Sequence, residues 1–156
     1  MSQPTLYVMR GLPGSGKSTE ARKIIKEFEA RGEMCIRLNK DEIRLMMGYS
    51  NWNNNIETVV REAIDKMTLA ALREGISVIN DNTNLSVRDI ADANENAEFY
   101  NANLIVDTRC LGVPVDECIA RDAQRTGSAK VGSDVIRGFV KKYPNLFKNS
   151  SQHENE

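Results

Sequence analysis

The sequence GLPGSGKS at residues 11–18 matches the phosphate-binding pattern G-x-x-x-x-G-K-[ST] at every position. A run of β-forming residues, TLYVMR at 5–10, precedes it, and the residues from Ser18 onward have the pattern of a helix closed by Gly32. In this order of strand, loop and helix, the loop amides and the positive end of the helix both attract an anion. The stretch therefore predicts a P-loop that binds a nucleoside triphosphate (NTP).

Strands and helices alternate beyond this loop. Further strands are expected at 34–39, 76–80 and 103–111. Helices are expected at 41–48, 56–74, 87–97, 115–125 and 134–143, the last capped by Ser133, with a loop at 49–55. The alternation predicts an α/β, three-layer P-loop NTPase fold, in which a parallel sheet has helices on both faces. We expect one P-loop domain over residues 1–148 and a disordered tail at 149–156.

The composition excludes several classes of function. Lys and Arg (21) nearly balance Asp and Glu (22), so there is no global basic field to hold long nucleic acid, although a local basic pocket for one end is compatible with this charge. No window approaches the roughly 18 apolar residues of a membrane span. We expect a cytoplasmic protein without a membrane partner. The single histidine lies in the tail, so any catalytic base is expected to be a carboxylate.

The P-loop predicts how the donor nucleotide is held. Lys17 is expected to reach the β and γ phosphates of ATP or another NTP, Ser18 to ligate Mg²⁺, and Thr19 to add a hydroxyl near the α phosphate. Arg121 and Arg125 lie four apart on one predicted helix and precede the flexible TGSAK, which is typical of a lid over the donor phosphates; a solvated surface helix is the alternative. The residues expected to bind the nucleotide are Gly11, Leu12, Pro13, Gly14, Ser15, Gly16, Lys17, Ser18, Thr19, Arg121 and Arg125.

The segment NKDEIR at 39–44 admits two interpretations. A guanine-reading N-K-x-D requires Asp where this chain has Glu42, and it would follow a later strand. In a kinase, Asp41 accepts the proton of an attacking hydroxyl, and Arg44, one helical turn away, binds a phosphate of the acceptor through a two-point fork. Taken alone, a helix-capping acid with a surface ion pair is an equal alternative.

A second polar segment, DNTN, follows the predicted strand at 76–80. Ligands of parallel sheets bind beyond the carboxyl ends of the strands, so the P-loop, NKDEIR and DNTN are expected to converge on one cleft. The residues expected to contact the acceptor are Asp41, Arg44, Asp81, Asn82, Thr83 and Asn84. Loops of this composition also often bond only to their own backbone.

From about Leu6 to Tyr143, the chain resembles the kinase module of bacteriophage-type polynucleotide 5′-hydroxyl kinases. The resemblance rests on GLPGSGKST, NKDEIR, NDNTNLSVRD and VPVDECIARDAQRTGSAKVGSDVIRGFVKKY, which occur in the order and at the spacing of that family. It implies transfer of the γ-phosphate of ATP or another NTP to the 5′-hydroxyl end of DNA or RNA, as in nucleic-acid repair. No D-x-D motif is present, so we expect kinase activity without 3′-phosphatase activity.

The resemblance also implies residue roles. Lys17 and Ser18 correspond to positions at the donor phosphates and Mg²⁺, Asp41 to the general base, Arg44 to the clamp on the neighbouring acceptor phosphate, and Arg125 to the catalytic lid arginine. Arg121 matches a second basic lid position. In the DNTN loop, family members place the acid either at the position of Asn82 or at that of Asp81, so both stay candidates.

Two other functions are compatible with a P-loop. The first is a kinase that acts on a small molecule or nucleotide, and the second is a nucleotide-binding module whose hydrolysis regulates a partner. The pair Asp41 and Arg44 with an arginine lid, in place of a water-positioning switch, favours a kinase over the regulatory module.

Overall fold

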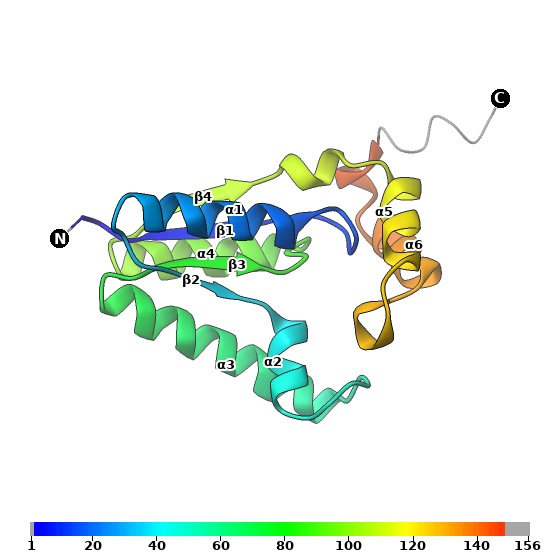
Figure 1. Cartoon of the computed structure of the whole chain (residues 1–156), viewed down its shortest axis with the longest axis horizontal. Helices are drawn as coiled ribbons and strands as arrows, with labels where there is room; N and C mark the ends of the chain where they lie inside the picture. The colour runs from blue at the N-terminus through cyan, green and yellow to red at the C-terminus, as the bar shows by residue number, and fades with distance from the viewer. Residues whose placement is uncertain (1, 149–156) are drawn as a thin grey trace.

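A parallel sheet forms the centre of the protein in the computed structural model, which describes residues 2–148 (Figure 1). The order of its strands is β2-β3-β1-β4. The strands are β1 (Thr5–Met9), β2 (Cys35–Leu38), β3 (Ser77–Asp81) and β4 (Asn103–Asp107). Every pair of neighbouring strands is parallel, so their carboxyl ends meet at one edge of the sheet. The tail expected to be disordered, 149–156, lies outside the described residues.

Helices cover both faces of the sheet. One face packs against α1 (Lys17–Ala30), and the other packs against α3 (Asn54–Arg73) and α4 (Val87–Phe99), as Figure 1 shows. The short helix α2 (Lys40–Met46) follows β2. This arrangement confirms the three-layer P-loop fold predicted from the alternation of strands and helices.

The apolar core is divided between the two faces of the sheet. Alternate strand residues point to opposite faces, so neighbours in one strand enter different clusters. Val78 joins the cluster under α3 and α4, whereas the adjacent Ile79 joins the cluster under α1, and both side chains are fully buried. Burial on both faces explains why two apolar residues, Val78 and Ile79, follow each other at the centre of β3.

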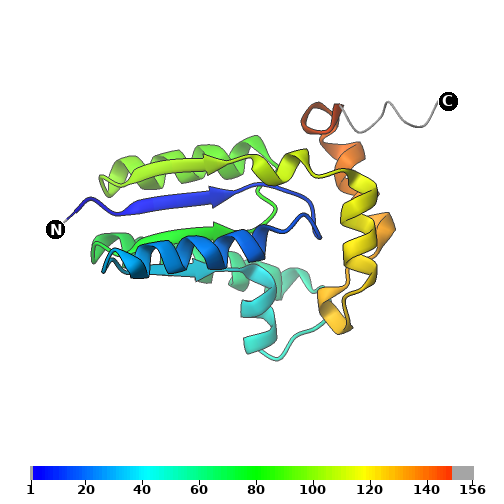
Figure 2. The same ribbon diagram turned by 45° about the horizontal axis from the view of Figure 1, so that its top comes forward.

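The last two helices lie beyond the carboxyl ends of the strands. Figures 1 and 2 both show α5 (Val115–Ala123) and α6 (Ser133–Lys142) there, and α2 projects from the same end of the sheet. A separate apolar cluster holds them together, with Cys118 and Ile136 fully buried against Leu12 of the P-loop. The lid predicted from the arginine spacing is therefore a packed helical pair that contacts the phosphate loop.

The ends of some elements differ from the sequence prediction. The strand expected at 103–111 ends at Asp107, because the Asp107 carboxylate accepts a hydrogen bond from the Arg109 amide (3.0 Å) and turns the chain into a 3₁₀ helix at Arg109–Gly112. Gly132, in a left-handed conformation with φ of 92°, caps α6 in place of Ser133. A side-chain bond sets the first boundary and a backbone conformation sets the second, and hydrophobic periodicity reports neither.

Within residues 2–148, no helix combines the length and apolar character needed to cross a membrane.

Candidate active site

The P-loop connects β1 to α1 and packs against the lid helix. Gly14 (φ 80°) and Gly16 (φ 91°) adopt left-handed conformations that L side chains rarely take. At Gly14 a Cβ would also overlap the carbonyl oxygen of Cys118 in α5. Glycine at this position is therefore required both by the turn and by the close approach of the lid.

Lys17 lies inside this loop. Its side chain is buried, and Nζ donates a hydrogen bond to the carbonyl oxygen of Leu12 at 2.8 Å. Burial lowers the pKa of Lys17 below its usual value, with the nearby Asp81 carboxylate opposing the shift. Lys17 forms no ion pair within residues 2–148, and an anionic phosphate at the loop would supply a charge partner for this ammonium group.

A basic hollow lies over the P-loop. Its lining combines loop residues with three arginines from the chain beyond β4. The lining residues are Gly14, Ser15, Gly16, Thr19, Glu20, Arg109, Cys110, Val113, Arg121 and Arg125. The structure thus brings the two lid arginines predicted from the sequence next to the predicted nucleotide loop, and it adds Arg109, which the sequence analysis did not single out.

The two lid arginines are held differently. Arg121 forms an ion pair with Glu117 one turn back in α5. Arg125 follows the helix, and its Nη1 contacts the Ala129 carbonyl at 3.4 Å and Asp122 at 3.9 Å, both weak contacts, with 39% of its side chain exposed. Arg125 is therefore the more easily recruited of the two by a bound anion.

Asp122 organises the loop that carries Arg125. The carboxylate is 1% exposed and accepts hydrogen bonds from the amides of Val131 (3.0 Å) and Gly132 (2.9 Å). These bonds join the end of α5 to the beginning of α6. The sequence analysis did not identify Asp122, because its partners are backbone amides about ten residues away.

Replacing Asp122 with alanine is expected to loosen the lid, because two amides lose their acceptor. Loss of such charge-assisted bonds should lower the free energy of unfolding by about 3 kcal/mol. Chemical denaturation measures the change, and limited proteolysis should show earlier cleavage within 124–132. Asp122→Asn, which keeps one carbonyl acceptor, should lose less, and equal stability of the alanine variant and the wild type would contradict this role.

The first turn of α2 is fixed to the loop after β3. The Asn39 side chain caps the helix by accepting from the Glu42 amide (3.0 Å), and its Nδ2 donates to the Asp81 carbonyl at 2.7 Å. Asn82 Oδ1 accepts from the Lys40 amide at 2.9 Å. Asn39 thus has a structural role here, and Asn82 helps to position the helix that carries Asp41.

Asp41 and Arg44 lie together at the exposed end of α2. Arg44 Nη1 donates to Asp41, while Nε and Nη2 form a two-point contact with Glu57 in the first turn of α3. Hydrogen bonding to Glu57, and then to Asp41, raises the pKa of Arg44 above its usual value. The guanidinium carries more N–H donors than these contacts use, so it can also bind an acceptor anion.

Exposure separates the roles of these two acids. The Asp41 side chain is 67% exposed, whereas that of Glu57 is 11% exposed. Asp41 is therefore accessible to an acceptor, and Glu57 holds Arg44 from behind. No sequence pattern indicates Glu57, because only the packing of α2 against α3 brings it to the site.

The DNTN residues differ from the expectation that all of them face an acceptor. Asp81 is 1% exposed and pairs with Arg37 on the donor side. Asn84 is buried, with φ of 45°, and its side-chain amide nitrogen, Nδ2, donates to the Met9 carbonyl at 2.8 Å. The Thr83 carbonyl accepts from the Gly11 amide at 3.1 Å. The segment thus supports the P-loop, because Thr83 and Asn84 bond to the backbone where β1 ends and the loop begins.

Ser18 and Asp81 fit a magnesium ion. Oδ1 of Asp81 is buried and has no hydrogen-bond partner among residues 2–148, and Arg37 bridges the other oxygen, Oδ2, to the Ser18 hydroxyl. No cluster of three or more His, Cys, Asp or Glu side chains suited to a metal occurs in the same residues. The Ser18 hydroxyl and the Asp81 carboxylate suit the usual coordination of Mg²⁺, which takes one or two oxygen ligands from the protein and its other ligands from phosphates and water.

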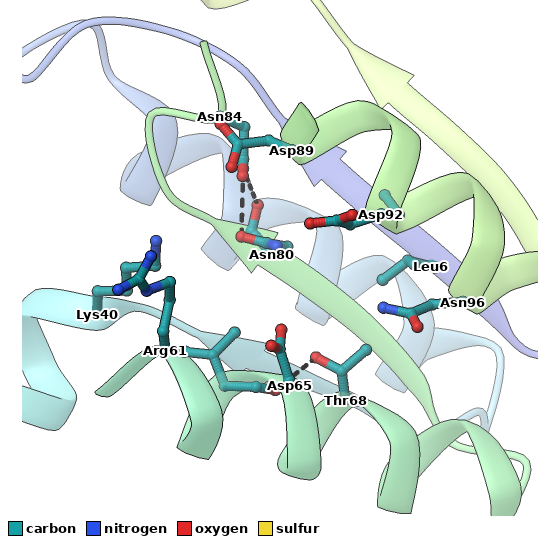
Figure 3. Close-up of a pocket in the computed structure, with 12 residues that line it drawn as sticks. Leu6, Lys40, Arg61, Asp65, Thr68, Asn80, Asn84, Asp89, Asp92 and Asn96 are labelled. Carbon is teal, nitrogen blue, oxygen red and sulfur yellow. Dashed lines mark hydrogen bonds between the residues drawn. The ribbon is translucent and has the colours of Figure 1, made fainter. Parts of the chain in front are cut away.

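A second hollow lies between α3 and α4, on the sheet face opposite α1. Figure 3 shows Asp65 and Asp92 turned toward the same space, with Lys40 and Arg61 at one end. Partial burial, together with the charge of Asp92, raises the pKa of Asp65. The carboxylates make this hollow a poor place for a phosphate, so the P-loop side is the better candidate for the nucleotide.

Comparisons with known proteins match this geometry. A family model described as an AAA domain matches residues 6–148. One chain of a structure titled Pnkp1/Rnl/Hen1 RNA repair complex is 26% identical, with a TM-score of 0.73 over 97% of this chain and 46% of that chain. A chain of a second Pnkp1/Rnl/Hen1 complex is 29% identical, with a TM-score of 0.63 over 82% of this chain and 42% of that one. The protein thus spans less than half the length of either chain.

A more distant likeness concerns the fold alone. A mutant of the APS kinase CysC of Mycobacterium tuberculosis is 18% identical, with a TM-score of 0.54 over 68% of this chain and 75% of that one. The family match and the two repair-complex chains confirm the resemblance predicted from the motifs.

Proposed function

The chain belongs to the AAA domain family, and from this premise we propose that it is a polynucleotide 5′-hydroxyl kinase. It transfers the γ-phosphate of ATP or another NTP to the 5′-hydroxyl end of DNA or RNA. The observation that carries the proposal is the cluster of Asp41, Arg44 and Glu57, in which an exposed carboxylate lies beside a guanidinium anchored by a buried acid. A bare alcohol needs only a base, whereas an acceptor with its own phosphate also needs the guanidinium.

The donor side supplies charge at the transferring phosphate. Lys17 exchanges its bond with the Leu12 carbonyl for phosphate oxygens, and Arg125 leaves its weak contacts to approach the same oxygens from the lid. Phosphoryl transfer spreads negative charge over these oxygens, so such pre-placed cations stabilise the transition state. Ser18 and Asp81 would hold Mg²⁺, which neutralises charge on the β and γ phosphates when it is bound with the nucleotide.

The acceptor side supplies the proton acceptor and the alignment. Asp41 takes the proton of the 5′-hydroxyl as its oxygen attacks the γ phosphorus, and the nucleoside diphosphate leaves on the opposite side. Arg44 binds the phosphate on the 3′ side of the first nucleoside and thereby holds the 5′-hydroxyl at Asp41. The two sides are linked, since Arg37 contacts both Ser18 of the P-loop and Glu42, the residue next to Asp41.

A label-transfer experiment tests this function. The protein is incubated with γ-labelled ATP, magnesium and DNA or RNA oligonucleotides that carry a 5′-hydroxyl, with 5′-phosphorylated copies of the same oligonucleotides as matched controls and with mononucleosides. Label is expected on the 5′-hydroxyl oligonucleotides, with much slower labelling of mononucleosides and none of the 5′-phosphorylated copies. Label on mononucleosides alone would favour a small-molecule kinase, and release of phosphate without any labelled acceptor would favour a regulatory NTPase.

Arg44→Ala is expected to weaken the use of acceptors that carry a phosphate after the first nucleotide. Loss of a charge-assisted bond should lower kcat/KM for an oligonucleotide about 10- to 100-fold, chiefly through KM. The measurement compares a nucleoside 3′-phosphate with the same nucleoside lacking the phosphate. An equal loss on both acceptors would argue against a phosphate clamp.

Glu57→Ala is expected to lower kcat/KM for the same acceptors about 100-fold, because Arg44 loses the two-point contact that aims it. Glu57→Gln keeps an acceptor oxygen and should recover part of the rate. Glu62→Gln, an exposed acid on the same helix, is the matched control. If the alanine variant changed the melting temperature but left the acceptor KM unaltered, Glu57 would be a structural residue only.

A further inference from the structure

Arg37 occupies an unusual place for an arginine on a sheet strand. It lies on β2 and points to the face covered by α1, and its side chain is only 11% exposed. Nε donates to Asp81 Oδ2 at 2.7 Å, and Nη2 donates to the Ser18 hydroxyl at 3.2 Å. The guanidinium thus contacts the two residues that fit a magnesium ion.

The buried carboxylate explains why a cation is needed there. Asp81 is 1% exposed, and a buried acid is costly unless a positive charge or hydrogen bonds compensate it. Arg37 compensates Oδ2, while Oδ1 has no hydrogen-bond partner in residues 2–148. One guanidinium therefore neutralises the carboxylate through Oδ2 and leaves Oδ1 available to a metal ion.

A metal ion held by Ser18 and Asp81 would lie beside this guanidinium, which already binds the Ser18 hydroxyl and one oxygen of the Asp81 carboxylate. A divalent cation beside Ser18 and Asp81 repels a positive charge that lies within hydrogen-bond distance of both, and the repulsion is strong where water is excluded. The third partner of Arg37 offers a place to move. Nη1 donates to Glu42 at 2.8 Å, and the Glu42 side chain is 57% exposed, at the open side of the site.

We propose that Arg37 is a positioning residue that acts as a built-in counter-ion: it neutralises Asp81 in the metal-free protein, releases Ser18 and Asp81 when magnesium and nucleotide bind, and then remains held by Glu42. Glu42 lies next to Asp41 in the first turn of α2. The movement of Arg37 toward Glu42 therefore links binding of the donor nucleotide to the helix that carries Asp41. The inference rests on the nucleotide and magnesium part of the proposed function and not on the identity of the acceptor.

The test measures how much Mg²⁺ the protein needs to bind a fluorescent, non-hydrolysable ATP analogue. Arg37→Met removes the competing charge, so the Mg²⁺ concentration for half-maximal binding should fall about tenfold. The metal-free melting temperature should also fall, because Asp81 loses its partner, and Mg²⁺ with the analogue should raise it more than in the wild type. Arg22→Met, an exposed arginine on α1, is the matched control for net charge and should change neither quantity.

A double-mutant cycle locates the effect at Asp81. In an Asp81→Asn background, Arg37→Met should shift the half-maximal Mg²⁺ concentration by less than about twofold, which is the deviation expected for two independent mutations. The shift is small because the carboxylate that would bind both Arg37 and Mg²⁺ has been removed. Arg37→Lys keeps a charge and should lie between the wild type and Arg37→Met, which covers the case of a methionine variant that fails to fold. An equal Mg²⁺ requirement in the wild type, Arg37→Lys and Arg37→Met, or an equal shift in both backgrounds, would overturn the inference.

The outcomes separate this inference from the proposed function. A wild type that binds the analogue without any dependence on Mg²⁺ would overturn the role assigned to Ser18 and Asp81 and, with it, the role of Arg37. If the analogue binds with a normal dependence on Mg²⁺ and Arg37→Met does not change it, only the counter-ion role of Arg37 is overturned. Transfer to an unexpected acceptor leaves the Arg37 result standing.

Discussion

Arg125→Ala is expected to lower kcat for phosphoryl transfer about 10³- to 10⁵-fold, the range for an arginine that neutralises the transferring phosphate. Arg125 lines the basic hollow over the P-loop, and its contacts in the protein alone are weak, at 3.4 Å to the Ala129 carbonyl and 3.9 Å to Asp122. These weak contacts contribute little to folding and leave the guanidinium available to a bound nucleotide, so its removal should affect the transition state more than folding.

Rapid-quench measurement of label transfer gives kcat, and analogue binding gives the nucleotide affinity separately. Arg125→Lys retains a charge without the planar fork and should recover only part of the rate. Arg137→Ala removes an exposed arginine from α6, outside the hollow, and is the matched control. A loss below tenfold in Arg125→Ala, with a normal melting temperature, would contradict a catalytic role for the lid.

Asp41→Asn is the second change with a large expected effect: kcat should fall about 10²- to 10⁴-fold, the usual contribution of a general base. The amide has nearly the same shape and still accepts a hydrogen bond from Arg44, but it cannot take the proton of the attacking hydroxyl. Affinity for the ATP analogue should stay within about twofold, because Asp41 is on the acceptor side.

The measurement is label transfer to a 5′-hydroxyl oligonucleotide under single-turnover conditions, so that product release does not hide the chemical step. Asp134→Asn removes an equal charge from an exposed position on α6 and serves as the control. A wild-type rate in Asp41→Asn would exclude Asp41 as the base, and a parallel loss of nucleotide binding would indicate a structural role.

The fold could be predicted because its signals are local. The P-loop pattern and the alternation of strand and helix each depend on neighbours in the chain, and the parallel sheet follows from their order. Boundaries were less accurate. The strand expected to reach residue 111 stops at Asp107, because a single side chain bonds to the amide two residues on.

Contacts between candidate residues could be predicted where both residues belong to one motif. Lys17, Ser18, Asp41 and Arg44 are placed as their spacing suggested, the last two touching across one helical turn. The DNTN loop was harder to interpret, since its letters do not report burial. Asp81 turns toward the donor side and Asn84 bonds to backbone, although both were expected to face the acceptor.

The order of residues along the chain accounts for the P-loop, its flanking elements and the arginine pair of the lid, because each of these needs only contacts within a few residues. The partners of the functional groups depend on packing. Glu57 reaches Arg44 across α2 and α3, Asp122 reaches the amides of Val131 and Gly132, and Arg37 joins Ser18 to Asp81 from a separate strand. Contacts between groups far apart in sequence exist only after the apolar core has closed and brought their elements together.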